Sequence, residues 1–169
     1  MSAKKQFDTA AIGVLLVTFF LLSGSPLAAA DPVGYAGWGK DSPYNQLYNF
    51  KDRDTFKGVV KGFKTVTPLP GMDPGTALLV DDSGDNIVIH LCPVHYASAE
   101  ETGLRKGDKV KVSGSWAMVG DQEVFIAAKI KWGDNSEFKV RLTSDGTPFW
   151  TMTPEQLAQE GGSTLAHQN

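Results

Sequence analysis

The 169-residue sequence predicts an all-β domain that folds as a small Greek-key barrel. Three observations carry this prediction: short apolar runs separated by turn residues, a single helical segment among them, and glycines inside the first run. The predicted order is three strands, a short helix and two strands, with a sixth short strand after them. This is the order of the OB-fold, a five-stranded barrel. An open six-stranded sandwich is the alternative.

Apolar runs bounded by turn residues form the predicted strands. They are residues 55–67, 76–80, 87–92, 109–118 and 123–132, followed by a short sixth run at 137–142. In the first run, Gly58 and Gly62 suggest bends or a bulge, which a small barrel needs where one strand joins both of its sheets. The second and third runs form a β-hairpin around the Asp-rich turn at 81–86. Residues 93–104 contain alanines and glutamates and form the predicted helix.

The first thirty residues have the pattern of an export signal. Lys4 and Lys5 precede an apolar stretch at 10–22, and small residues follow it up to Ala30. The stretch is shorter than the roughly 20 residues that span a bilayer, so an uncleaved anchor is the weaker alternative. We therefore predict cleavage after Ala30 and a periplasmic or otherwise exported protein, which contacts a membrane only through this segment before cleavage.

The predicted domain is flanked by two less regular segments. We predict the signal peptide at 1–30, an irregular aromatic arm at 31–54, the OB-fold domain at 55–150, and a flexible tail at 151–169 with a helical turn at 154–159. The chain has 16 Lys and Arg against 19 Asp and Glu, a formal net charge of −3. Nucleic-acid affinity rests largely on phosphate neutralisation by Lys and Arg, so a nucleic-acid partner is disfavoured.

Residues 87–95 hold the most informative chemistry of the chain. They contain its only cysteine and two of its three histidines, as His90, Cys92 and His95. Alternation along a strand predicts that His90 and Cys92 share a face, about 7 Å apart, with His95 at the following turn. A thiolate with two imidazoles suits copper or zinc. A haem-ligand role for either histidine is also open, although the covalent signature Cys-x-x-Cys-His is absent.

Two interpretations of this cluster remain open. As an electron-transfer copper site it would need a weak fourth ligand, for which Met72 and Met118 are candidates. As a structural cluster, His90 would bind a neighbouring loop and Cys92 would be buried and inert, the commonest state of a lone cysteine. An exposed Cys92 in an oxidising compartment could also pair with a cysteine of another molecule. We favour the structural interpretation.

An ordered set of short motifs extends over residues 38–150. They are Trp38-Gly-x-x-Ser42-Pro-Tyr44-Asn-x-Leu47-Tyr48, Gly58-x-Val60, Pro70-Gly-Met72, His90-Leu-x-Pro93, Gly107-Asp-x-Val110-x-Val112-x-Gly-Ser115, Arg141-Leu142 and Gly146-x-Pro148-x-Trp150. This set resembles a group of small exported bacterial OB-fold proteins, distant relatives of periplasmic OB-fold stress-tolerance proteins. The resemblance implies a fold and an export route but no reaction. It also implies that Cys92 and His95 are additions of this chain, because the group has a glycine and an aromatic there.

No catalytic motif accompanies these elements: the sequence has neither a Gly-x-Ser-x-Gly elbow nor a phosphate loop. We interpret Asp81, Asp82 and Asp85 as a solvated turn. Lys106, Lys109 and Lys111, near Trp116, could form a ligand-binding face, but they are also ordinary solvent-side positions, and we favour the latter. The sequence therefore predicts that the protein is not an enzyme.

The predicted function is that of an exported, non-enzymatic binding module. OB barrels bind ligands on strands two and three and in the adjoining loops. The candidate contacts are Leu79, Val88, His90, Pro93 and Trp116. The partner would be another exported protein, a saccharide or a small molecule. The alternative is a cell-envelope protein for metal handling or electron transfer, which holds copper, zinc or haem through His90, Cys92 and His95.

Overall fold

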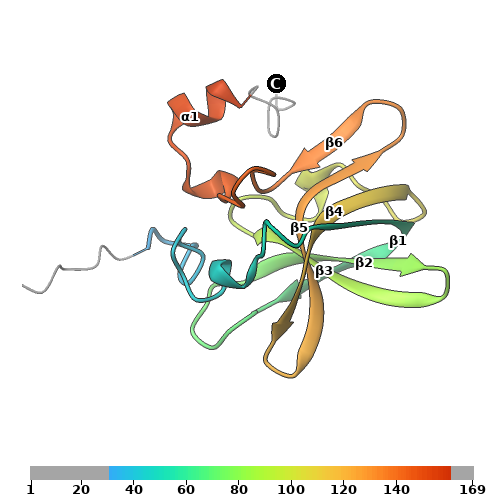
Figure 1. The fold of residues 1–169 in the computed structure, drawn as a ribbon, viewed down its shortest axis with the longest axis horizontal. Coiled ribbons are helices and arrows are strands. Elements are labelled where there is room, and N and C mark those ends of the chain that lie inside the picture. The colour runs from blue at the N-terminus through green and yellow to red at the C-terminus, as the bar shows by residue number, and fades with distance from the viewer. Residues whose placement is uncertain (1–30, 161–169) are drawn as a thin grey trace, which may run out of the picture.

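The computed structural model describes residues 31–160, so the predicted signal segment and residues 161–169 lie outside the described part of the chain. Six strands dominate the described residues (Figure 1). They are β1 (Asp54–Val66), β2 (Gly75–Asp82), β3 (Asp85–Pro93), β4 (Lys109–Val119), β5 (Gln122–Trp132) and β6 (Ser136–Lys139). Three 3-10 turns, η1 (Asn45–Leu47), η2 (Glu100–Thr102) and η3 (Phe149–Thr151), precede a short helix, α1 (Pro154–Gln159). No described helix is long and apolar enough to span a bilayer.

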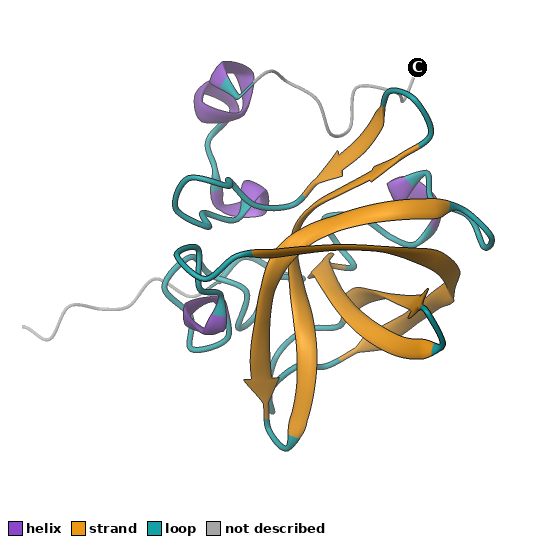
Figure 2. Cartoon of the chain, turned by 45° about the vertical axis from the view of Figure 1, so that its right-hand side comes forward, coloured by secondary structure: helices purple, strands orange, loops and turns teal. Residues whose placement is uncertain are grey.

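The strands close into a ring, which confirms the predicted barrel and excludes the open sandwich. β1 pairs with both β2 and β4, β2 pairs with β3, and β4 pairs with β5, all antiparallel. The ring closes where β3 runs parallel to β5 through the pairs Ile89–Phe125 and His90–Ile126. β6 adds to the outer edge of β5. Along the chain the strands follow the predicted order, and Figure 2 shows them curving around one interior.

β1 bends where it changes partner from β4 to β2. Its register with β2 shifts between Val60 and Gly62, so Lys61 is the extra residue of a bulge. A Cβ atom on Gly58 would lie 2.5 Å from the carbonyl oxygen of Asp81, closer than any side chain permits. The glycine thus allows the close approach of two backbones, and the bulge predicted for this strand lies next to Gly62.

The predicted helix at 93–104 is wrong in extent, because only η2 is helical there. The preceding backbone instead bonds to β2 and its loop. The Thr76 hydroxyl donates to the Ala97 carbonyl at 2.7 Å, and the Val94 amide donates to the Pro74 carbonyl. The first bond takes the Ala97 carbonyl, which a helix would use within itself, and Ala97 is fully buried.

Two apolar clusters stabilise the fold. One fills the barrel interior, with Leu78, Ile89 and Phe125 at its centre. The other lies outside the barrel, where residues 31–53, which we call the arm, cover β5 and the end of β4. Its fully or largely buried members are Trp38, Tyr44, Tyr48, Val119, Val124, Ile126 and Ala128. The arm aromatics therefore pack on the domain, as their composition predicted.

Candidate functional site

Cys92 lies in the barrel interior and is fully buried. Its thiol donates to the Ala97 carbonyl, with 3.7 Å between sulfur and oxygen. Burial raises the pKa of Cys92 to about 12, a change that the positive charge of Arg141 only partly offsets. The thiolate is the form that attacks electrophiles and binds metals, so this side chain is held in its unreactive state.

His90 lies on the outer surface of β3, beneath the arm, and is only 4% exposed. Its Nδ1 atom and the Tyr44 hydroxyl are hydrogen-bonded at 3.1 Å. Burial lowers the pKa of His90 to about 4, and the positive charges of Lys64 and Arg141 act in the same direction. The imidazole is therefore neutral at physiological pH and bonded to a side chain of its own protein.

The structure does not bring the three predicted metal ligands together. Thr76 pairs with Cys92 and Ala77 pairs with His90, so Leu91 is an extra residue that breaks the alternation of β3. The prediction that His90 and Cys92 share a face is therefore wrong: Cys92 points into the interior and His90 toward Tyr44. His95 is exposed, with its ring edge-on to Tyr35 at 5.3 Å.

No group of three or more His, Cys, Asp or Glu side chains within residues 31–160 is arranged to hold a metal. The two proposed fourth ligands also lie apart. Met72 packs against the arm cluster, whereas Met118 is 55% exposed near the end of β4. The donor set that copper or zinc would need is thus not assembled in this fold.

The predicted ligand contacts occupy different environments. Leu79 and Val88 pair directly across β2 and β3 and are half-buried. Pro93 is buried, and His90 is covered by the arm. Trp116 is 39% exposed, edge-on to Phe125 with 5.1 Å between ring centroids. The binding face that OB barrels commonly use is therefore partly occupied here by the protein's own chain.

Arg141 fastens the arm to the barrel, a role that sequence patterns did not indicate. The side chain is 1% exposed, and one guanidinium nitrogen donates to the carbonyls of Leu91 at 3.2 Å and Ala127 at 2.9 Å. The other donates to Asn45 Oδ1 at 2.9 Å. The Asn45 amide in turn donates to the Trp38 carbonyl, which also accepts from the Trp150 indole. One buried network thus joins the arm, the barrel and the C-terminal segment.

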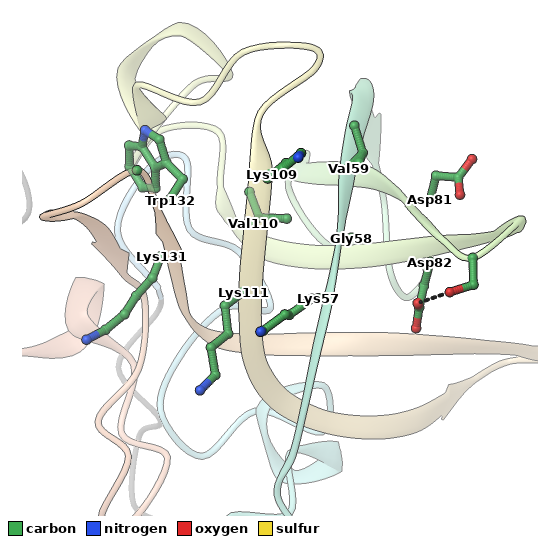
Figure 3. A pocket seen from close by; sticks show the side chains of 12 residues that line it. Lys57, Gly58, Val59, Asp81, Asp82, Lys109, Val110, Lys111, Lys131 and Trp132 are labelled. Atoms are coloured by element: carbon green, nitrogen blue, oxygen red, sulfur yellow. Dashed lines mark hydrogen bonds between the residues drawn. The ribbon is translucent and has the colours of Figure 1, made fainter.

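A cavity of about 550 Å³ lies on the outside of β1, β4 and β5, beside the β2–β3 turn. Lys57 pairs directly with Lys111, and Lys111 pairs directly with Lys131, so three lysines form a row across three neighbouring strands. We call this row the lysine ladder. Figure 3 shows Lys57 and Lys111 side by side, between Lys131 on one flank and Asp82 on the other.

The charges around this cavity are only partly neutralised. Glu137 forms ion pairs with Lys131 at 3.6 Å and Lys139 at 3.1 Å. Lys61 pairs with Asp81 at 3.3 Å. Within residues 31–160, the structure shows no ion pair for Lys57, Lys109 or Lys111, which also line the cavity or its rim. The cavity is therefore a cationic site on an acidic protein.

Sequence reasoning missed the ladder for a physical reason. The alternation of Lys109 and Lys111 is visible along β4, but the neighbours of Lys111 are set by strand register. Its partners lie 54 positions before it and 20 after it, as their numbers show. The sequence does contain one usable signal, which is that three predicted strands each carry outward-facing lysines. A prediction of which strands are neighbours could have placed these lysines in one row.

Comparison with known protein families matches residues 52–137, about half of the chain, to the MamS/MamX magnetosome protein family. The matched span contains all five strands of the ring and the whole lysine ladder. It includes neither Arg141 nor most of the arm. No curated protein matches the chain. The extent of the family match shows that this chain belongs to the MamS/MamX magnetosome protein family.

Proposed function

We propose that this protein is an exported, non-enzymatic binding module that serves the magnetosome and holds an anionic partner on the lysine ladder. One observation carries the proposal: a cavity of about 550 Å³ is lined by four lysines, Lys57, Lys109, Lys111 and Lys131. Clefts lined by charge of one sign raise the local concentration of oppositely charged ligands. The family name supports the magnetosome setting, and the signal-like residues 1–30 support export.

The state of the two reactive side chains favours binding over catalysis. Burial raises the pKa of Cys92 to about 12 and lowers that of His90 to about 4. Both groups are thus neutral at physiological pH, and each is already hydrogen-bonded within the protein. The copper or zinc alternative lacks geometric support, because the Leu91 bulge separates His90 from Cys92.

The binding surface proposed here differs from the one that the sequence suggested. Tyr44 covers His90, so a ligand could reach that part of the β2–β3 face only by displacing the arm. The ladder needs no such displacement, because its three lysines are exposed. The partner is still another exported protein or a small ligand, now with the added requirement of negative charge.

Anion binding is tested by titrating the purified protein with dextran sulfate while the backbone amide signals are followed by NMR. We expect saturable shifts around the cavity, and at least a tenfold weaker affinity in the triple variant Lys57→Gln, Lys111→Gln, Lys131→Gln. The control, Lys51→Gln, Lys64→Gln, Lys106→Gln, removes the same charge at exposed positions elsewhere. Equal losses in both variants, absence of saturable binding, or reproducible hydrolytic or redox turnover would refute the proposal.

Export is tested separately by identifying the N-terminus of the protein purified from its native cells. Mass spectrometry is expected to find a chain that begins at Asp31 in the cell-envelope fraction. A chain that still carries residues 1–30 in the cytosolic fraction would show that this segment is not an export signal. That result would leave the anion-binding part of the proposal unaffected.

A further inference from the structure

The cavity offers apolar as well as cationic contacts. Val59 lines it and is 37% exposed, an unusual exposure for a strand valine, and the half-buried Trp132 lines it from β5. In Figure 3 Val59 and Trp132 flank Lys109 and Val110 in the upper part of the view, and the amino groups of the lysine ladder point toward the lower part. A ligand that fills the cavity would therefore meet positive charge and apolar surface together.

We infer that the occupant is an extended acidic segment of another protein, with an apolar side chain seated against the exposed Val59. The inference rests on the proposed function and names its partner class. Neighbouring strands lie about 4.8 Å apart, so the three ladder positions span about 10 Å. Carboxylates on alternate residues of an extended segment are about 7 Å apart, a spacing that long lysine side chains can meet.

The choice of lysine agrees with such a partner. All four basic residues that line the cavity are lysines. Arginine is the residue that reads phosphate groups in a fixed two-point geometry, whereas lysine presents a mobile point charge. A nucleic acid is thus less suited to this site than an acidic peptide, whose carboxylates are mobile as well.

The shape and rim of the cavity argue against a membrane surface. Asp82 and Ser83 line it at the β2–β3 turn, and Asp82 forms no ion pair within residues 31–160. A continuous sheet of lipid phosphates would meet this carboxylate, whereas a narrow peptide can pass beside it. Residues 161–169 do not match this partner class, because they contain no Asp or Glu.

The ladder also breaks a rule of sheet stability. Like charges directly opposite each other on neighbouring strands are destabilising, yet this row contains two such pairs in succession. Departures from local rules are expected at functional sites, where another requirement outweighs stability. An acidic partner supplies the missing negative charge, so binding would relieve the repulsion that folding leaves in place.

The inference is tested by calorimetric titration of the whole protein with three blocked synthetic peptides. The first is Glu-Thr-Glu-Leu-Glu-Thr-Glu, the second replaces Leu by Ser, and the third replaces every Glu by Gln. We expect the first peptide to bind at least tenfold more tightly than either of the others. In Val59→Ser the advantage of Leu over Ser should fall severalfold, and in the ladder triple variant the advantage of Glu over Gln should disappear.

The outcomes separate this inference from the proposed function. If dextran sulfate binds at the ladder but the Leu and Ser peptides bind equally, the inference is wrong and the anion-binding function stands. Tighter, ladder-dependent binding to vesicles of anionic phospholipid, or to a single-stranded oligonucleotide, would also overturn it. If no anion binds at all, both proposals fail. Circular dichroism of each variant checks that the fold is retained, which we expect because the substituted side chains are exposed.

Discussion

The barrel has two outer surfaces that differ in how far the protein's own chain covers them: one is buried by the arm and the other is open. On the surface of β3 and β5, the arm buries apolar side chains, and the polar atoms of His90 and Asn45 are hydrogen-bonded within the same chain. On the surface of β1, β4 and β5, three lysines face one another and the cavity beside them stays open. The first surface is completed by folding, and the second lacks the charge that would balance it. The difference supports the surface of β1, β4 and β5 as the proposed binding surface.

The same contrast appears in the two kinds of cation. Arg141 is buried, and its guanidinium group is held by neutral acceptors and by the ring of Trp150, whose centroid lies 4.9 Å away. The ladder lysines are exposed to solvent. A buried cation is costly to leave without partners, and both terminal nitrogens of Arg141 are hydrogen-bonded, although its Nε atom has no partner among the described residues. An exposed lysine is solvated by water, so it needs no partner within the protein and remains accessible to a ligand.

The largest expected effect is on the covered surface. Replacing Arg141 by Ala removes its hydrogen bonds to Leu91, Ala127 and Asn45 and leaves a cavity beneath the arm. We expect the free energy of unfolding to fall by about 3–5 kcal/mol, measured by guanidinium denaturation. Arg105→Ala is the matched control at an exposed turn and should change it by less than about 0.5 kcal/mol. Similar values for the two variants would show that Arg141 does not fasten the arm.

The next effect concerns pH and the same covered surface. The folded-state pKa of His90 is about 4, against an ordinary value of 6.5. The unfolded chain therefore binds an extra proton between these two pH values. His90 should contribute its full stability above pH 6.5, and about 3 kcal/mol of it should be lost as pH falls to 4.

Urea unfolding at a series of pH values tests this contribution. In His90→Gln, the part of the pH dependence between 6.5 and 4 should be smaller than in the unmodified protein. His95→Gln is the control, because His95 is exposed and should leave the His90 contribution in place. An unchanged profile in His90→Gln would show that this histidine is not buried in its neutral form.

The smallest expected effect is on the open surface and has the opposite sign. Lys111→Gln removes the central charge of the ladder and therefore both like-charge pairs. We expect stability to rise by about 0.2–1 kcal/mol, with the larger values at low ionic strength because salt screens exposed charges. Lys106→Gln, at an exposed turn, is the control in the same denaturation assay. A loss of stability in Lys111→Gln would mean that Lys111 makes stabilising contacts within the folded protein that outweigh its repulsion from Lys57 and Lys131.

The sequence predicted the strands and their order because apolar periodicity and turn residues are local signals. It could not predict the two features that decide the chemistry. The extra residue at Leu91 turns Cys92 away from His90, and no glycine or proline marks that position. The ladder depends on register between strands that are distant in sequence. The role of Arg141 was equally hidden, because its acceptors are mainly backbone carbonyls brought together only by the closed barrel.

The parallel contact between β3 and β5 is the seam of the ring, with only two residue pairs along it. Arg141 donates to one carbonyl on each side of that seam, from Leu91 on β3 and Ala127 on β5. The seam is thus bridged by a residue that follows every strand of the barrel in the sequence. The strands of the ring can pair before the C-terminal segment docks, but the seam gains these two hydrogen bonds only when Arg141 is in place. A fragment limited to the family-matched residues 52–137 would keep the lysine ladder and lose the hydrogen bonds of Arg141 across the seam.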